Sequence, residues 1–285
     1  MAVSKLTTTQ HQVDAAGLTY VYPVISRRMG GLSVGINFNI NNACNWRCIY
    51  CQVPDLKLGA APEIDLVLLE AELRYFLNDV LYGSFYKRFG VDPTQQEIKD
   101  IAIAGNGEPT SLKAFPAAVA LIGRVATELG VFPKCPFVLI TNGSLIHQQR
   151  VQAGLRCMAT YGGEVWFKLD SATEAGRARI NHTAQSCEAS INNLLISAQC
   201  CQTKIQTCLV DDDNQGLSVA EQDAFLAVLS KIKAAGSPVR DILLYTLARP
   251  SLQPEASHIK PLALDKLEDF AGKMQAVGFS VRVHS

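Results

Sequence analysis

The chain of 285 residues lacks a long apolar run. No uninterrupted apolar stretch approaches the roughly 18 residues that a membrane-spanning helix needs. Residues 1–12 are polar, so the apolar segment of a signal peptide is missing as well. We therefore expect a cytoplasmic protein with no membrane partner.

An excess of charge of either sign is also absent. The 26 Lys and Arg residues balance the 26 Asp and Glu residues. A surface that binds RNA is expected to be basic, because phosphate contacts supply much of the affinity. The composition therefore makes RNA a less favoured partner than a small molecule or a peptide.

Cysteine pairs with a C-x2-C spacing are missing outside residues 44–51. The nine cysteines are odd in number, and without an export signal they are expected to stay reduced. Six of them are interpreted as core thiols: Cys135, Cys157, Cys187, Cys200, Cys201 and Cys208. Cys208 lies inside a predicted strand and could face the interior of the fold.

What the chain does have is a C-x3-C-x2-C run of Cys44, Cys48 and Cys51, with Tyr50 directly before the third cysteine. Thiolates at this spacing can bind three corners of one iron–sulfur cube from a single loop. Three thiolates leave one iron open to a ligand that is not protein, and that iron is the expected seat of the chemistry. The alternatives are a structural zinc site and a bare electron-transfer cluster. Zinc prefers four protein ligands, commonly in two C-x2-4-C pairs.

Strand-like and helix-like patterns alternate along the chain. Six apolar strand-like runs are each followed by a helical spacing, which predicts a parallel sheet with right-handed crossovers. Because a closed barrel needs eight such units, we predict an α/β fold that is an open, partial (β/α)6 barrel with mostly parallel strands. The expected strands are 34–40, 101–104, 137–141, 165–169, 204–210 and 242–245, and the expected helices are 66–80, 114–129, 145–160, 187–199, one beginning at 218, and 263–277.

A single domain is expected over residues 1–285. It would comprise an N-terminal extension (1–32), a barrel core (33–250), and a C-terminal helix and edge strand (251–285). Ser218 and Glu221 form a capping-box pattern at the start of one helix. The longest irregular connection, 83–96, is expected to be a lid or an insertion.

The cysteine loop, Cys44-Asn-Trp-Arg-Cys48-Ile-Tyr50-Cys51, resembles the signature of the radical S-adenosylmethionine superfamily. The resemblance implies a radical-SAM-type barrel with a 4Fe-4S cluster on the three cysteines and S-adenosyl-L-methionine on the open iron. An external electron donor would reduce the cluster, and the cofactor would be cleaved to a 5′-deoxyadenosyl radical. Tyr50 would lie near the adenine.

Further segments at the ends of predicted strands resemble the same superfamily. Gly105-Asn106-Gly107-Glu108 is similar to its Gly-Gly-Glu motif, and Glu108 could accept hydrogen bonds from the methionyl ammonium. Asp170 or Ser171 could hydrogen-bond the ribose, or Asp170 could pair with Lys168, which points the same way in an alternating strand. The resemblance implies cofactor contacts at Tyr50, Asn106, Gly107, Glu108, Thr141, Asn142, Lys168, Asp170, Ser171 and Arg249.

The reaction itself is less defined by the sequence. His182 and Cys208 are candidate catalytic residues, and the role of His182 rests on the near-neutral titration of imidazole. Over residues 35–250 the motifs look like the branch of iron–sulfur oxidoreductases related to wybutosine synthetases, which modify transfer RNA. Three functions stay open: a radical enzyme acting on a small molecule or peptide, a related enzyme acting on RNA, and a non-catalytic iron–sulfur electron carrier or redox sensor.

Overall fold

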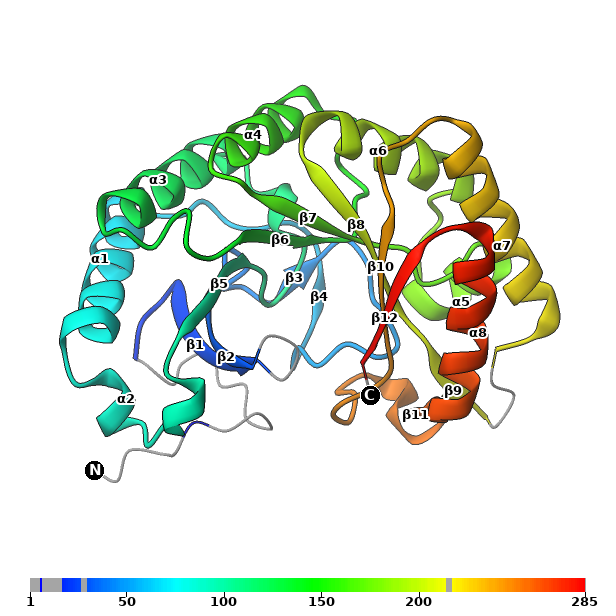
Figure 1. Ribbon diagram of the computed structural model, residues 1–285, viewed down its shortest axis with the longest axis horizontal. Coiled ribbons are helices and arrows are strands. Elements are labelled where there is room, and N and C mark those ends of the chain that lie inside the picture. The colour runs from blue at the N-terminus through cyan, green and yellow to red at the C-terminus, as the bar shows by residue number, and fades with distance from the viewer. Residues whose placement is uncertain (1–5, 7–16, 27–29, 214–216, 285) are drawn as a thin grey trace.

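A curved eight-stranded sheet forms the centre of the computed structural model, which describes residues 6, 17–26, 30–213 and 217–284. Seven of its strands pair in parallel, and β1 pairs with β2 in the antiparallel direction (Figure 1). In sheet order the strands are β1 (Val21–Ser26), β2 (Gly31–Ile36), β5 (Ile98–Ile103), β6 (Phe137–Thr141), β7 (Glu164–Lys168), β8 (Gln202–Cys208), β10 (Asp241–Tyr245) and β12 (Ser280–His284).

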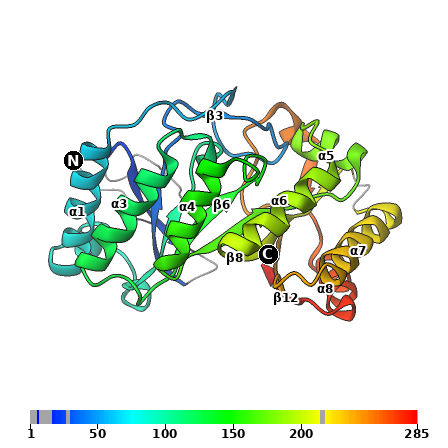
Figure 2. The same ribbon diagram turned by 90° about the horizontal axis from the view of Figure 1, so that it is seen from above.

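Six helices cover the convex face of this sheet, as Figures 1 and 2 show. In five of them the buried residues are mainly apolar and recur at three- and four-residue steps, which lays an apolar stripe against the strands. In the sixth, Cys187–Cys200, the buried residues are largely polar: Ser190, Asn193, Leu194 and Ser197. The helices are α1 (Leu66–Tyr82), α3 (Phe115–Glu128), α4 (Gln149–Thr160), α6 (Cys187–Cys200), α7 (Val219–Ala234) and α8 (Leu264–Val277). None of the helices in the described ranges is both long enough and apolar enough to cross a bilayer.

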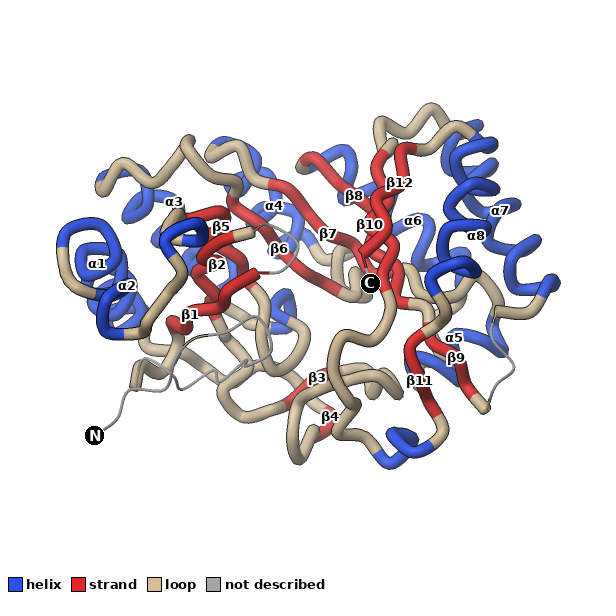
Figure 3. The backbone as a smooth tube through the Cα atoms, turned by 60° about the horizontal axis from the view of Figure 1, so that its bottom comes forward, coloured by secondary structure: helices blue, strands red, loops and turns tan. Residues whose placement is uncertain are grey.

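The predicted open α/β barrel is confirmed, since β1 and β12 end the sheet order rather than pairing with each other, and Figure 3 shows them well apart. All six predicted strands are present, and the edge strand pairs in parallel with β10. The strand β1 was not predicted. It lies in the segment interpreted as an extension and adds an antiparallel edge to the sheet. The division of the chain into one domain stays a prediction.

Short elements complete the chain. They are β3 (Ala43–Cys44), β4 (Lys57–Leu58), α2 (Phe85–Arg88), α5 (Glu174–Asn181), β9 (Val210–Asp212), β11 (Ile259–Pro261) and the 3-10 helices Pro93–Gln95, Pro109–Ser111 and Pro254–Ser257. The connection 83–96 is not a lid over the cysteines. It leads into the amino end of β5, at the opposite ends of the strands from the cysteine loop. Phe85 in this connection is buried against Phe76.

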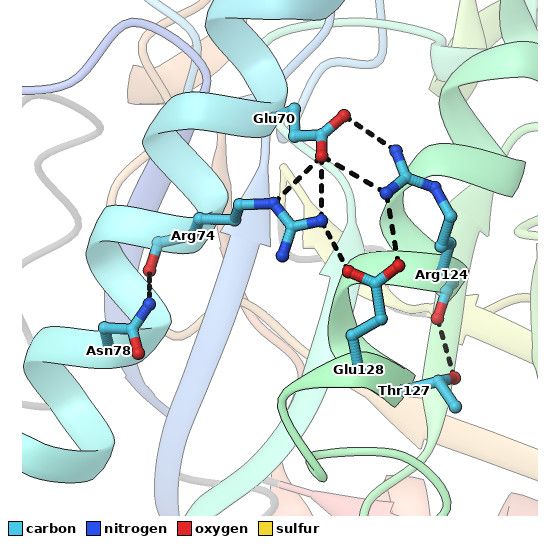
Figure 4. A network of polar contacts seen from close by, with 7 residues as sticks. Glu70, Arg74, Asn78, Arg124, Thr127 and Glu128 are labelled. Atoms are coloured by element: carbon cyan, nitrogen blue, oxygen red, sulfur yellow. Dashed lines mark hydrogen bonds and ion pairs between the residues drawn. The ribbon is translucent and has the colours of Figure 1, made fainter.

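Charged side chains join α1 to α3 on the outer surface (Figure 4). Arg124 binds Glu70 at 2.7 Å, and Arg74 binds both Glu70 and Glu128. Exposed ion pairs contribute little to stability, so we expect this network to add little to the free energy of unfolding.

Candidate functional site

A cavity of about 670 Å³ opens at the carboxyl ends of the parallel strands and extends into the barrel. Ligands of parallel α/β folds bind at this end. The three cysteines of the loop line this cavity together with residues from the ends of several strands. Among them are Cys44, Cys48, Tyr50, Cys51, Asn106, Gly107, Glu108, Thr141, Asn142, Lys168, Cys208, Tyr245 and Arg249.

The cysteine loop is held by backbone hydrogen bonds to the end of α5. The amide of Ile49 donates to the carbonyl of Ile180 at 2.9 Å, and the amide of Arg47 donates to the carbonyl of Asn181 at 3.2 Å. The last carbonyls of a helix have no partner within it, so they are free to bind another segment. On the other side, the Ser251 hydroxyl donates to the carbonyl of Ile49 at 2.7 Å.

The three cysteine side chains are half-buried thiols. Burial raises the pKa of Cys44 to about 12, and burial also raises the pKa of Cys48. Within the described ranges, no three His, Cys, Asp or Glu side chains are grouped as one metal ion would require. Structural zinc takes four protein ligands, whereas iron–sulfur clusters are held by cysteine thiolates. Three thiols of one loop on one cavity therefore fit a cluster better than a lone zinc ion.

Gly107 lets the cysteine loop approach the end of β5. A Cβ atom at this position would lie 2.0 Å from the carbonyl oxygen of Ala43 and 2.6 Å from Nδ2 of Asn39. Gly105 has φ +139°, and a Cβ atom there would lie 2.4 Å from Oδ1 of Asn37. The glycines of the Gly-Asn-Gly-Glu segment are therefore required by close backbone packing.

Asparagine side chains connect the loops around the cavity. Oδ1 of Asn37 accepts from the amide of Asn106 at 3.1 Å, and Nδ2 of Asn39 donates to the carbonyl of Ala43 at 2.8 Å. Nδ2 of Asn106 donates to Oδ1 of Asn42, and Nδ2 of Asn142 donates to Oδ1 of Asn45, each at 2.8 Å. The network consists of Asn37, Asn39, Asn42, Asn45, Asn106 and Asn142. Only the last two were predicted as site residues, although the dense asparagines of 37–45 were a usable signal.

The Glu108 carboxylate is bound by neighbouring protein groups. It accepts from the amide of Thr110 at 3.0 Å, the hydroxyl of Thr110, the hydroxyl of Thr141 at 2.6 Å and the amide of Asn142 at 2.7 Å. A carboxylate offers about four lone-pair positions. Burial raises the pKa of Glu108, and these hydrogen bonds act in the opposite direction. Glu108 thus joins the ends of β5 and β6. Three of these donors bind Oε1 and only the Asn142 amide binds Oε2, so Oε2 keeps a lone pair for an ammonium group, and that contact stays a prediction.

We expect Glu108→Ala to destabilise the protein by about 2–4 kcal/mol, because two buried amides, of Thr110 and Asn142, lose their acceptor. Urea unfolding of the apo-protein measures this change. Glu108→Gln retains an acceptor oxygen and should lose less. Equal stability of Glu108→Ala and the wild type would show that the carboxylate does not hold the two strand ends.

The Tyr50 hydroxyl lies between Lys168 and Asp170. Nζ of Lys168 donates to this hydroxyl at 3.2 Å and lies 4.8 Å from the ring centroid, and the hydroxyl donates to the Asp170 carboxylate. Burial lowers the pKa of Lys168, but Tyr245, Cys48 and Asp170 nearby raise it above its ordinary value overall. The tyrosine therefore links Lys168 and Asp170, for which a direct pair was one of the alternatives.

The remaining predicted residues occupy different surroundings. Thr141, Arg249 and Cys208 line the cavity, and the Cys208 thiol hydrogen-bonds to Tyr245. Ser171 is buried, and its hydroxyl donates to Glu221 at 2.6 Å. The Ser218 hydroxyl caps α7 through the Glu221 amide, as predicted, whereas the Glu221 carboxylate accepts from Ser171, Ala172 and Thr173. Among the described residues that line the cavity, neither Ser171 nor His182 occurs.

His182 belongs to a polar cluster on the outer side of the cysteine loop. Its ring lies 2.8 Å from Nη2 of Arg47 and 3.3 Å from the carboxylate of Glu255. Arg47 and Glu255 form an ion pair at 2.6 Å. This cluster ties the loop to the 3-10 helix Pro254–Ser257, and the catalytic role of His182 stays a prediction.

The hydrogen bond from Arg47 lowers the pKa of Glu255 to about 2. A carboxyl with a depressed folded pKa stabilises the protein above its ordinary pKa, near 4.5, and loses this contribution as pH falls towards 2. We expect Glu255→Gln to cost about 1 kcal/mol near neutral pH after solvent screening, and nothing near pH 2. Urea unfolding of both proteins across this range measures the difference. A difference independent of pH would contradict the assignment.

Known protein sequences match less than half of this chain. No protein-family model matches the chain. A GTPase Obg from Brachyspira hyodysenteriae is 29% identical over 133 residues, and a UPF0026 protein from Helicobacter pylori is 29% identical over 136 residues. Each match covers 47% of this chain, but only 17% and 38% of the respective relative. The chain thus spans less than half of the length of these relatives.

Solved structures match over most of the chain. A radical SAM methyltransferase from Sphaerobacter thermophilus aligns with a TM-score of 0.62 at 13% identity, covering 93% of this chain and 68% of that one. A spore photoproduct lyase variant aligns at 0.55 and 10% identity, covering 85% and 74%. TYW1 with a lysine-pyruvate adduct aligns at 0.51 and 17% identity, covering 86% and 73%. The chain has the fold of the radical SAM enzymes.

Proposed function

We propose that this protein is a radical S-adenosylmethionine enzyme that acts on a small-molecule or peptide substrate. The observation that supports this best is the convergence of Cys44, Cys48, Cys51 and the Gly107-Glu108 segment on one cavity. The fold shared with radical SAM enzymes agrees with the proposal.

The residues of the cavity have distinct tasks in this proposal. Cys44, Cys48 and Cys51 would hold a 4Fe-4S cluster. When bound, the cluster supplies an electron that cleaves S-adenosylmethionine and so starts hydrogen abstraction. The Gly105–Gly107 backbone and Asn142 border the space next to the cysteines, where they can bind the cofactor. Tyr50, fixed by Lys168 and Asp170, presents an aromatic ring to the same space.

The inner part of the cavity favours a substrate of small cross-section. It is walled by residues of β1, β2, β5, β7 and β8 that include Tyr22, Ser33, Ala102, Trp166 and Gln206. A bare electron carrier has no need for such a cavity beside its cysteines. RNA is the second candidate, because TYW1 shares the fold. The balanced charge of 26 basic and 26 acidic residues favours the small substrate.

The decisive experiment is anaerobic reconstitution with iron and sulfide, followed by S-adenosylmethionine and dithionite. We expect 5′-deoxyadenosine to form, as measured by chromatography. A protein that holds the cluster and forms no 5′-deoxyadenosine would refute the enzymatic proposal. Filter binding of transfer RNA across a salt series tests the second candidate, since phosphate contacts make binding steeply salt-dependent.

A further inference from the structure

Asn181 and Arg177 lie on one face of α5, directly behind the cysteine loop. Their spacing of four residues places the two side chains next to each other on the helix. Asn181 is 0% exposed and Arg177 is 1% exposed. The end of the same helix binds the loop backbone at Arg47 and Ile49, so both side chains have a fixed position relative to the cysteines.

The Asn181 amide group donates to the sulfur of a cysteine in the loop. Nδ2 lies 3.3 Å from Sγ of Cys48 and 2.8 Å from Oδ2 of Asp170. An amide NH2 has two hydrogens, and each of them has an acceptor here. Asp170 is itself held by Tyr50 and by the amide of Cys208 at 2.9 Å. The orientation of Asn181 towards the sulfur is thus set by a second, buried partner.

Arg177 places a positive charge in the same region. Nε donates to the carbonyl of Gln185 at 2.9 Å, and Nη2 donates to the Ser190 hydroxyl at 2.7 Å. The guanidinium lies 5.4 Å from the ring centroid of Trp46, which stands between the first two cysteines. Its hydrogen-bond acceptors are neutral groups.

Two atoms of this pair have no hydrogen-bond partner in the part of the chain that the structure describes. They are Nη1 of Arg177 and Oδ1 of Asn181, and both are fully buried. A buried cation whose hydrogen-bond acceptors are neutral is costly, although the charges of Asp170 and Glu174 act on Arg177 from a distance. Negative charge at the nearby cysteines would offset that cost, and cysteine thiolates with an iron–sulfur cluster carry such charge.

We propose that Asn181 and Arg177 raise the reduction potential of the cluster held by Cys44, Cys48 and Cys51. The inference rests on the proposed function. On reduction the cluster gains one electron from the external reductant, and therefore one negative charge. A hydrogen bond to a ligand sulfur and a buried cation both stabilise the more negative form, and hydrogen bonds and charge are known determinants of cluster potential. Both are positioning residues, because they act through the cysteine loop.

The test is an EPR-monitored redox titration of the reconstituted full-length protein with dithionite. We expect Asn181→Leu to change the equilibrium constant for cluster reduction about tenfold in favour of the oxidised cluster. For one electron, this corresponds to a reduction potential about 59 mV more negative than that of the wild type. Arg177→Met should shift it in the same direction, and Arg177→Lys, which keeps the charge, should shift it less. Arg179→Met is the matched control, because Arg179 is on the same helix but half-exposed and paired with Asp212.

Potentials of Asn181→Leu and Arg177→Met equal to that of the wild type would overturn the inference. If Arg177→Met does not fold, Asn181→Leu and the milder Asn181→Ser decide, and unchanged potentials in both refute it. An equal shift in Arg179→Met would also refute it, because the effect would then be one of overall charge. If the wild type assembles no cluster, both the inference and the proposed function are overturned. If 5′-deoxyadenosine forms but the variants have unchanged reduction potentials, only the inference is overturned.

Discussion

Replacing Cys44, Cys48 and Cys51 together by alanine is expected to reduce bound iron to background and to abolish 5′-deoxyadenosine formation. These thiols line one cavity and come from one loop. Clusters of this class are held by cysteine sulfur, and Cys208, the one other cysteine among the described residues that line the cavity, cannot supply three ligands. Iron and sulfide analysis after anaerobic reconstitution measures the first effect, and chromatography of the reaction mixture measures the second.

The matched control removes three cysteines elsewhere. Cys157, Cys187 and Cys200 are also half-buried, and they lie on α4 and α6 rather than in the loop. Their joint replacement by alanine should leave iron content and cofactor cleavage close to wild type. Iron retained by the loop variant, or lost equally by the control variant, would show that the cluster is not held by Cys44, Cys48 and Cys51.

Gly107→Ala is expected to destabilise the protein by about 3 kcal/mol and to prevent stable cluster binding. The new Cβ atom would lie 2.0 Å from a backbone oxygen, that of Ala43, which cannot rotate away as a flexible side chain would. Overpacking a well-packed site typically costs about 1–3 kcal/mol. The cysteine loop must shift relative to β5 to relieve the contact, and Cys44 directly follows Ala43. Urea unfolding and iron content after reconstitution measure the two effects.

Gly59→Ala is the matched control for this substitution. A Cβ atom at Gly59 would meet the same residue, Ala43, but at an ordinary distance of 3.5 Å from its Cβ. The hydrogen bond from the amide of residue 59 to the carbonyl of Cys44 would stay intact. We expect a change in stability within about 0.5 kcal/mol and a normal iron content. Similar losses in both variants would mean that the close approach at Gly107 has no special role.

Local patterns in the sequence predicted the elements of the fold. The three- and four-residue spacing of Leu69, Leu73, Phe76, Leu77 and Val80 produces the buried face of α1. The apolar runs 101–104 and 137–141 correspond to β5 and β6. These patterns repeat every few residues, so they are visible without knowledge of partners. Similarly, the cysteine spacing fixed the three candidate ligands, which line one cavity as expected.

The surroundings of the candidate ligands could not be predicted in this way. Asn181 lies 133 residues from Cys48, whose sulfur it contacts, and Thr141 lies 33 residues from the carboxylate of Glu108. Contacts between residues so far apart in the sequence depend on which strands become neighbours in the sheet. The sequence motif suggested that Glu108 binds a ligand, whereas the adjacency of β5 and β6 provides it with protein donors.

The sequence by itself determined the alternation of strands and helices, the openness of the barrel and the identity of the loop cysteines, because each follows from residue type and short spacing. Only the tertiary structure decided that β1 extends the sheet, that Tyr50 separates Lys168 from Asp170, and that α5 supports the cysteine loop. The reason is that these contacts form only when distant segments pack together, and packing selects partners by shape and hydrogen bonding that no local pattern encodes.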